Sequence, residues 1–284
     1  MKKFCIIGVS GFVAKKHLNS IKNLDGKLVA VCDIHENVGF LDELYPKTKF
    51  FNNENKFFKY ISEKKIDYLV ICTPTFLHFN SIKRGLSLGL NVIVEKPPLL
   101  SFKEYSKVRN LEKKYGKKCF CIFQIRANKK IIKLKKDIDK QKKTYDVKIN
   151  YSTFRGDWYF KSWKNIKTKS GGLLVNIGIH FFDLLIWFFG DVEKIKFEIK
   201  KQNHAKGYMK LKKANVKWTL STLNKKSYKK RKKFDRHMII DKTKINFDNF
   251  NNLHTDNYKM IINKNFFHIS EFEKIIKLIP ILKK

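Results

Sequence analysis

A lysine and a histidine in this chain stand in contexts that suit proton transfer. Lys96 lies in Glu95-Lys96-Pro97, directly after an apolar run. His180 follows Asn176 by four residues in a strongly apolar helix expected after Gly171, so both should lie on one face of that helix. A lysine amine can hydrogen-bond a substrate hydroxyl, a histidine exchanges a proton near neutral pH, and an asparagine amide can orient a group without carrying its proton. These three are the candidate catalytic residues, with a surface lysine and a buried core histidine as the alternative interpretations.

A glycine-containing turn follows the first apolar run and suits a dinucleotide. Small residues allow the backbone to approach a pyrophosphate. Backbone amides at the N-terminus of a helix can then bind its negative charge. The spacing G-x-x-G-x-x-A departs from the strict G-x-G-x-x-G, so on its own it also fits an ordinary strand-to-helix turn. Asp33 ends the next apolar run, where a carboxylate binds ribose hydroxyls and repels a 2′-phosphate, which favours NAD. The cofactor-binding candidates here are Gly8, Gly11, Phe12, Val13 and Asp33.

Two further apolar runs end in polar residues that packing does not require. In open parallel sheets, the carboxyl ends of the strands form the ligand crevice. We therefore expect these strand ends to contact the cofactor as well. The residues concerned are Thr73, Pro74, His78, Glu95 and Lys96.

The elements that must position these side chains follow from the apolar pattern. Up to residue 124 short apolar strands alternate with amphipathic helices, which predicts a doubly wound parallel sheet of the Rossmann type. Later segments alternate as half-exposed strands, which favours an α+β domain with an open, largely antiparallel sheet. We expect one broad face of this sheet to be too apolar to remain solvated, which favours a homodimer or homotetramer. We place an NAD-binding domain at 1–122 and a substrate-binding and oligomerisation domain at 123–284. The expected strands are 4–8, 28–33, 68–72, 91–94, 119–124, 146–154, 192–200, 208–213 and 216–223, and the expected helices of the first domain are 13–24, 57–64, 77–88 and 103–115.

Composition narrows the class of protein. The formal charge of +37 would raise nucleic acid as a partner, but lysine is spread over nearly every segment, so we expect none. The densest run, Lys225 to Lys233, fits an exposed loop. Apolar runs fall well short of the roughly 20 residues that cross a bilayer, and the start of the chain lacks a signal-peptide pattern, so a cytoplasmic location is expected. The five cysteines fit buried free thiols, and no metal is expected.

The motifs together resemble the Gfo/Idh/MocA family of glucose-fructose oxidoreductases and inositol dehydrogenases. They are Glu95-Lys96-Pro97, Thr73-Pro74 with His78, and Gly171-Gly172 followed by Asn176, His180 and Asp183. Within the family the chain is most similar to UDP-N-acetylglucosaminuronate 3-dehydrogenases of surface-polysaccharide synthesis. The segments behind this closer resemblance include Gln124-Ile-Arg126, Arg155-Gly-x-Trp158-Tyr159, Ser162-Trp163-Lys164 and Leu253-His254-Thr255.

The resemblance implies an NAD-dependent oxidation of the C3 hydroxyl of a UDP-sugar acid, with Lys96 and His180 acting on that hydroxyl. Many relatives carry an aspartate where this chain has Asn176. The resemblance also implies a 2-oxo acid as a candidate oxidant of NADH, a homodimer or homotetramer, and a role in O-antigen synthesis. Alternatives are a family member acting on another sugar or cyclitol, and a catalytically silent NAD-binding regulator. The implied substrate-binding residues are Gln124, Arg126, Arg155, Trp158, Ser162, Trp163, Lys164, Asn176 and His180.

Overall fold

The computed structural model describes residues 1–223, 234–248 and 253–283, which form two compact units. Unit 1 comprises Met1–Ala127 and Asn252–Ile276, and unit 2 comprises Asn128–Asn251 and Lys277–Lys284. The sequence predicted one break, after residue 122. In the structure the break falls after Ala127, and the chain re-enters unit 1 near its end. The basic run Lys225 to Lys233 lies outside the described residues.

Unit 1 is built on a six-stranded sheet in the order β3-β2-β1-β4-β5-β6. Every neighbouring pair is parallel, which confirms the expected Rossmann-type sheet. The first strand is nearly all buried, as a parallel sheet covered on both faces requires. The short edge strand β3 was not expected, and β6 ends three residues earlier than predicted. The strands are β1 (Lys3–Ile7), β2 (Lys27–Cys32), β3 (Lys49–Phe51), β4 (Tyr68–Ile71), β5 (Asn91–Val94) and β6 (Cys119–Cys121).

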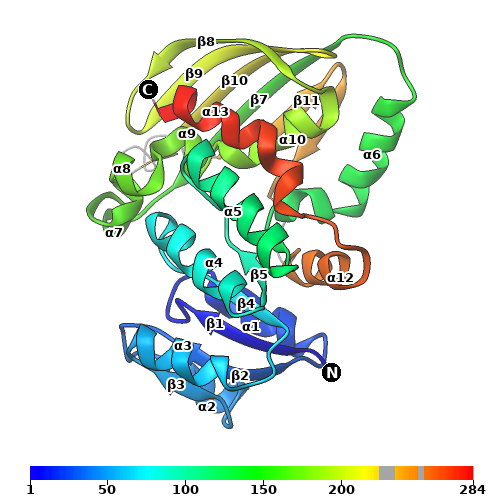
Figure 1. Cartoon of the computed structure of the whole chain (residues 1–284). Coiled ribbons are helices and arrows are strands. Elements are labelled where there is room, and N and C mark those ends of the chain that lie inside the picture. The colour runs from blue at the N-terminus through cyan, green and yellow to red at the C-terminus, as the bar shows by residue number, and fades with distance from the viewer. Residues whose placement is uncertain (224–233, 249–252, 284) are drawn as a thin grey trace. The chain divides into compact units, whose positions relative to one another are not determined.

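Helices cover this sheet, and two of them begin with a side-chain cap. The Asn53 side chain accepts a hydrogen bond from the Lys56 amide at the start of α3, and Ser101 does the same for Glu104 at the start of α5. Figure 1 shows α4 and α5 lying side by side. The helices are α1 (Ala14–Lys22), α2 (Phe40–Leu44), α3 (Glu54–Ser62), α4 (His78–Ser87) and α5 (Phe102–Tyr115), with 3₁₀ turns at Thr75–Leu77 and Gln124–Ala127.

A C-terminal segment completes unit 1. Helix α12 (His254–Lys264) packs against α1, and a 3₁₀ turn at Ile269–Phe272 leads into α13 (Glu273–Lys283). The ring of Phe272 stacks on that of Phe123 with centroids 4.3 Å apart. This return could not be located from local pattern because it depends on contacts between segments far apart in the chain.

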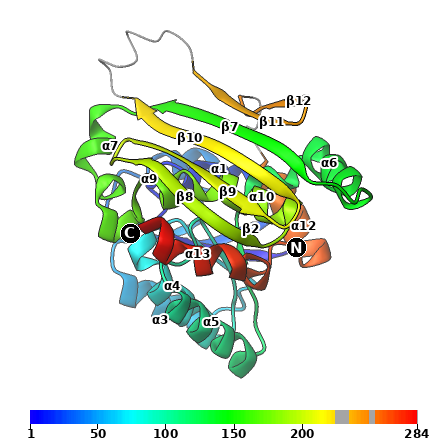
Figure 2. The ribbon, with the colours of Figure 1, turned by 90° about the horizontal axis from the view of Figure 1, so that it is seen from above.

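Unit 2 contains a second six-stranded sheet in the order β12-β11-β7-β10-β9-β8. Only the pair β7 and β10 is parallel among its strands, so the expected largely antiparallel sheet is confirmed. Figure 2 shows these strands side by side. The last two strands, β11 and β12, were not predicted. The strands are β7 (Tyr145–Phe154), β8 (Val192–Lys200), β9 (His204–Leu211), β10 (Ala214–Leu223), β11 (Arg236–Ile240) and β12 (Thr243–Asn246).

The two faces of this sheet differ in polarity. One face packs against helices, where Phe182 of α10 meets Trp218 of β10 edge to face at 5.4 Å. We expected the other face to be too apolar to remain solvated. That expectation is wrong, because the alternate positions of β7, β9 and β10 carry polar side chains, among them Lys148, Lys206, Lys210 and Lys217.

The apolar helix expected after Gly171 is in fact two helices. Helix α9 (Gly172–Asn176) ends before α10 (Ile179–Phe189), and the helical stretch through α9 bends by 51° into α10. A Cβ at Gly178 would lie 2.5 Å from the Leu174 carbonyl oxygen and 2.8 Å from the Leu220 side chain, so this close approach needs glycine. The remaining helices of unit 2 are α6 (Lys129–Asp139), α7 (Asp157–Lys161) and α8 (Lys167–Ser170), with a 3₁₀ turn at Trp163–Asn165.

Within the described residues, no single helix is both long and apolar enough to span a membrane. The bent pair formed by the α8–α9 stretch and α10 has the length and apolar composition of a membrane span. However, α10 is almost entirely buried in the protein.

Candidate active site

The glycine turn joins β1 to α1 in a conformation that other residues would not adopt. Gly8 has φ +86°, and a Cβ there would lie 2.5 Å from the backbone nitrogen of Thr73. The Gly8 amide donates to the Cys32 carbonyl at 2.8 Å, which ties the turn to β2. Helix α1 then begins at Ala14 with no side-chain cap. The Ala14 and Lys16 amides donate to the Gly11 and Val13 carbonyls at 2.9 Å, and no side chain caps this positive end of the helix, which suits a phosphate-binding turn.

Asp33 lies beside this turn with its carboxylate fixed by the backbone. Oδ2 accepts a hydrogen bond from the Ser10 amide and Oδ1 accepts one from the His35 amide, both at 2.9 Å. Each oxygen retains a lone pair that can accept a ribose hydroxyl. Two apolar side chains nearby in sequence, Phe12 and Ile34, are 83% and 81% exposed, a surface that a bound nucleotide would cover.

The end of β4 offers a second polar group to a cofactor. The Oγ1 atom of Thr73 is buried and has no hydrogen-bond partner among the described residues. A buried hydroxyl without a partner is costly, and a bound ligand would satisfy it. Together with Gly8 and Asp33, this atom shows that the residues present fit a dinucleotide. Pro74 is half-buried next to Thr73.

His78, predicted to bind the cofactor, is instead occupied by the backbone of unit 1. Its Nδ1 lies 2.9 Å from the Pro97 carbonyl oxygen and its Nε2 lies 2.9 Å from the Thr73 carbonyl oxygen. Burial lowers the pKa of His78, and the hydrogen bonds to carbonyl groups oppose that shift. The geometry thus favours a brace between the segments after β4 and β5.

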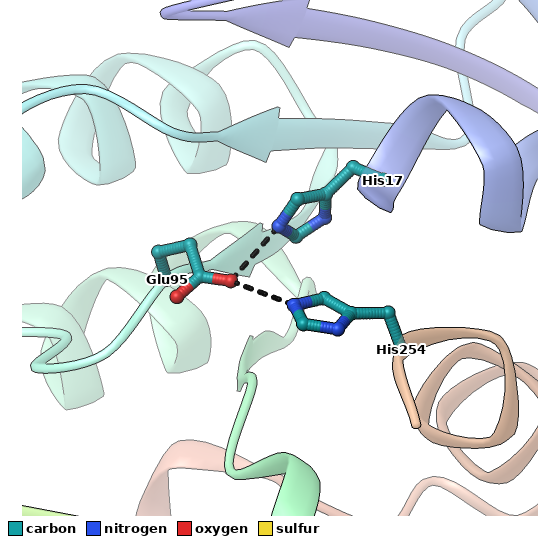
Figure 3. Close-up of side chains that lie close together, drawn as sticks. All are labelled: His17, Glu95 and His254. Atoms are coloured by element: carbon teal, nitrogen blue, oxygen red, sulfur yellow. Dashed lines mark hydrogen bonds and ion pairs between the residues drawn. The ribbon is translucent and has the colours of Figure 1, made fainter. Parts of the chain in front are cut away.

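Glu95 is likewise engaged within the protein. Figure 3 shows its carboxylate between two imidazole rings: Oε1 lies 2.9 Å from His17 Nε2 and 3.3 Å from His254 Nε2. Burial by itself would raise the pKa of Glu95, but the hydrogen bonds from both histidines hold it well below its usual range. Lys96, the next residue, is half-buried at the end of β5.

In unit 2 the break between α9 and α10 separates Asn176 from His180. Asn176 is the last residue of α9, and His180 is half-buried in the first turn of α10. The expectation that both lie on one face of a single helix is therefore wrong. The Nδ2 group of Asn176 donates to the Tyr159 hydroxyl at 3.4 Å, and burial raises the pKa of Tyr159. Tyr159 is part of the motif Arg155-Gly-x-Trp158-Tyr159, but the sequence alone did not predict a role for it.

The segment after β7 gathers cations and aromatic rings. The Lys164 ammonium lies 4.9 Å from the ring of Trp158 and 5.8 Å from that of Trp163, while the Arg155 guanidinium lies 5.5 Å from the ring of Tyr159. Trp158 is 54% exposed, so its indole face remains accessible. These groups suit an anionic ligand that carries a ring.

Three other predicted substrate residues differ in how far their polar atoms are already engaged. The Ser162 hydroxyl accepts from the Lys164 amide at 3.3 Å and donates to the Tyr159 carbonyl at 2.9 Å. Arg126 is buried in unit 1, 3.5 Å from Glu271, so its charge is already paired there. Gln124 keeps a buried Oε1 without a hydrogen-bond partner among the described residues. The geometry favours Gln124 over Arg126 as a ligand contact.

Comparison with known proteins identifies the family. The pattern "Oxidoreductase family, NAD-binding Rossmann fold" matches residues 2–123, and "Oxidoreductase family, C-terminal alpha/beta domain" matches residues 135–258. The WlbA (WbpB) dehydrogenase from Thermus thermophilus, solved in complex with NAD and UDP-GlcNAcA, is 33% identical with a TM-score of 0.94 over 100% of this chain and 95% of that one. The chain belongs to the Gfo/Idh/MocA oxidoreductase family. The expectation of an NAD-dependent oxidoreductase is thereby confirmed, and unit 1 carries the family's NAD-binding Rossmann domain.

Further comparisons show how far the likeness extends. The same Thermus protein has been solved with NAD and alpha-ketoglutarate. The scyllo-inositol 2-dehydrogenase (NAD(+)) of Bacillus subtilis (strain 168) is 28% identical over 133 residues, which is 47% of this chain and 38% of that protein. The matched region of this chain spans 33% to 40% of the length of the curated relatives to which it is similar, the scyllo-inositol dehydrogenase among them. The myo-inositol 2-dehydrogenase of Lactobacillus plantarum shares the fold, with 18% identity, a TM-score of 0.80, and coverage of 99% of this chain and 96% of that one.

Proposed function

We propose that this protein catalyses the NAD-dependent oxidation of the C3 hydroxyl of a UDP-linked sugar acid, UDP-N-acetylglucosaminuronate, to the 3-keto sugar nucleotide. The observation that carries the proposal is the likeness, over the whole chain, to a dehydrogenase solved with NAD and UDP-GlcNAcA. The fixed carboxylate of Asp33 and the cation and aromatic groups after β7 are chemically suited to these two ligands.

In this proposal, the residues of unit 1 hold the coenzyme. Gly8, Gly11, Phe12 and Val13 form the turn that approaches the pyrophosphate, and Asp33 accepts the ribose hydroxyls. Bound NAD⁺ would supply the acceptor for the hydride from C3, and a 2-oxo acid would serve as the oxidant of NADH, becoming the 2-hydroxy acid by uptake of a hydride and a proton. Alpha-ketoglutarate in the Thermus complex supports that choice of oxidant.

Proton transfer falls to Lys96 and His180. Both side chains act on the reacting hydroxyl, whose proton passes to His180 or to Lys96. Asn176, whose amide is held by Tyr159, orients the hydroxyl. General base assistance of this kind is typically worth about 10² to 10⁴ in rate.

Recognition of the substrate anion falls to the segment after β7 in unit 2. Arg155 and Lys164 supply cations for the diphosphate and the sugar carboxylate, and Trp158 and Trp163 supply ring faces for a base or sugar. A place in surface-polysaccharide (O-antigen) synthesis is part of the proposal, because a 3-keto sugar nucleotide is suited to later transamination. The cytoplasmic location stays a prediction.

The test is reduction of NAD⁺, followed by NADH absorbance, against a panel of UDP-sugars, UDP-sugar acids and free inositols, each with and without 2-oxoglutarate. The proposal expects turnover with UDP-N-acetylglucosaminuronate above all others. Preferred turnover of a free inositol, with no thermal stabilisation by UDP, would assign the protein to a cyclitol substrate instead. NAD⁺ binding with no turnover of any compound would favour a silent regulator.

A further inference from the structure

Three segments far apart in the chain converge on Glu95 inside unit 1. His17 comes from α1, Glu95 follows β5, and His254 is the first residue of α12 (Figure 3). All three side chains are buried. The ring of His17 also lies against Tyr258, whose hydroxyl is 2.8 Å from His17 Nδ1. We call His17, Glu95, His254 and Tyr258 the Glu95 clamp.

The hydrogen-bond pattern assigns a protonation state to the Glu95 clamp. An ionised Glu95 accepts hydrogen bonds, so both histidines present Nε2–H to it. His17 Nδ1 then accepts from the Tyr258 hydroxyl. His254 Nδ1 has no hydrogen-bond partner among the described residues. His17 is therefore neutral and Glu95 carries the charge.

The same three side chains have the composition of a metal site, since their ligand atoms lie within 4.8 Å of one another. Metal-bound histidines donate their second ring N–H to a partner, which fixes the ring. His17 has such a partner in Tyr258, but His254 Nδ1 has none among the described residues. The geometry therefore favours a hydrogen-bonded carboxylate over a metal ligand set.

The Glu95 clamp acts directly on the backbone of Lys96. While Oε1 of Glu95 faces the two histidines, Oε2 accepts a hydrogen bond from the Lys96 amide at 3.2 Å. Directly after Lys96, the carbonyl oxygen of Pro97 lies 2.9 Å from Nδ1 of His78. The backbone that carries Lys96 is thus fixed on both sides by buried histidines.

We propose that Glu95, held by His17 and His254, is a positioning residue for Lys96. The inference rests on the proposed function, in which the Lys96 amine meets the substrate hydroxyl. A catalytic group must be held within about 0.5 Å of its productive position, and a misplacement of about 1 Å can cost on the order of 10² in rate. His254 belongs to α12, which lies in the C-terminal segment that returns to unit 1. In this proposal that segment therefore helps to position Lys96 and also completes the fold of unit 1.

The experiment compares His254→Ala with His254→Gln. Alanine removes the donor to Glu95, whereas a glutamine amide can replace it. We expect His254→Ala to lower kcat by roughly 10-fold to 100-fold while the Kd for NAD⁺ changes less than about 2-fold, and His254→Gln to recover most of the loss. Equal kcat in the two variants, or a loss seen only in NAD⁺ affinity, would overturn the proposal.

A matched control separates positioning from stability. His268 contacts a different buried carboxylate of unit 1, with Nε2 at 2.8 Å from Glu112 Oε1. His268→Ala should lower the thermal midpoint, as His254→Ala does, but leave kcat within about 2-fold of the native value. The reason is that His268 does not contact the segment that carries Lys96, so its loss should not displace the Lys96 amine. A fall in kcat as large as that of His254→Ala would mean that any loss of buried contacts in unit 1 has this effect, which contradicts the proposal.

Amide hydrogen exchange supplies a readout that needs no substrate. In His254→Ala and Glu95→Gln we expect faster exchange in peptides spanning 92–100, with β1 peptides unchanged, and in His254→Gln a return toward the native rate. Unchanged exchange at 92–100 would refute the positioning role of the Glu95 clamp, whatever the sugar substrate is. Absence of turnover by the native protein would refute the proposed function but would not bear on the Glu95 clamp. Removal of bound metal with EDTA should leave kcat unchanged, and a loss restored by Zn²⁺ would show a metal site instead.

Discussion

At the scale of single residues, Asp33 is the group whose surroundings bear most directly on coenzyme choice. Two backbone amides, those of Ser10 and His35, fix both carboxylate oxygens. The carboxylate therefore cannot turn away to admit a 2′-phosphate without losing these bonds. This is a stronger reason for NAD preference than the position of an acidic residue in the sequence.

Asp33→Ser should narrow the preference for NAD⁺ over NADP⁺ in kcat/KM by about 10-fold or more, equivalent to about 1.4 kcal/mol of differential binding. A serine cannot repel a 2′-phosphate and is a weaker partner for ribose hydroxyls. Asp42→Ser, which removes an exposed acid of α2, should leave the ratio unchanged. A native protein that uses NADP⁺ as well as NAD⁺ would contradict the assignment of Asp33.

Lys96→Met and His180→Asn should each lower kcat by about 10² to 10⁴, because each removes a group that acts on the reacting hydroxyl. NAD⁺ affinity, measured by fluorescence titration, should be nearly unchanged, and the double variant should lose less than the product of the two effects. Asn176→Ala should cost less, since an amide carries no proton. Lys65→Met, at an exposed lysine, is the matched control. Turnover within a few-fold of native in either catalytic variant would remove that residue from the mechanism.

At the scale of elements, the break between α9 and α10 determines where His180 lies. Gly178→Ala would place a Cβ 2.5 Å from the Leu174 carbonyl oxygen, so we expect a loss of about 1 to 3 kcal/mol in the free energy of unfolding and a fall in kcat as α10 shifts. Urea unfolding and steady-state assays measure both. Gly39→Ala serves as control, because a Cβ there meets nothing within 4 Å. Equal stability of the two variants would show that the break tolerates a side chain.

The packing of α12 on α1 should make stability depend on pH. Burial lowers the pKa of His17 below its ordinary value of 6.5, so its contribution is present above about pH 6.5 and is lost as the pH falls through the lowered folded-state pKa. The thermal midpoint should therefore fall between about pH 7 and pH 5 in the native protein. The fall should be smaller in His17→Gln but not in His35→Gln, which changes an exposed histidine. Parallel curves for native protein and His17→Gln would contradict this account.

At the scale of the whole molecule, the open face of the unit 2 sheet is the surface whose character differs most from expectation. Lys148 and Lys217 stand opposite each other on paired strands, while Lys206 and Lys210 on the next strand are paired with Glu198 and Glu193. Lys148 and Lys217 repel the same residues of a second copy of this face at low ionic strength. Self-association through it would have to overcome that repulsion.

A homodimer or homotetramer remains our prediction, and its stability should rise with salt if the open sheet face is the interface. Screening of the lysine charges weakens the repulsion between copies. Sedimentation equilibrium at low and high salt tests both statements. A monomeric mass at micromolar concentration under every condition would contradict assembly, and association that weakens with salt would place the interface elsewhere.

Much of the fold was predictable because its signals are local. Short apolar strands alternating with amphipathic helices are sufficient to predict the parallel sheet of unit 1, and the strand predicted at 91–94 has the bounds of β5 (Asn91–Val94). The glycine turn, Asp33 and the Glu95-Lys96-Pro97 motif were found for the same reason, since each depends on residue type and short spacing at a strand end. The break at Gly178 was missed because an apolar run says nothing of the side chain of Leu220 that packs against it.

Only the tertiary structure determined what the polar side chains at those strand ends do. His78 and Glu95 both looked like cofactor ligands from sequence, yet each is held inside unit 1 by groups from other segments. His254 lies 159 residues beyond Glu95, and no periodicity links the two positions. Sequence by itself determined which chemical groups stand at the carboxyl ends of the strands. Folding determined which of them remain available to a ligand, because a buried charge must find its hydrogen-bond partners wherever the chain brings them.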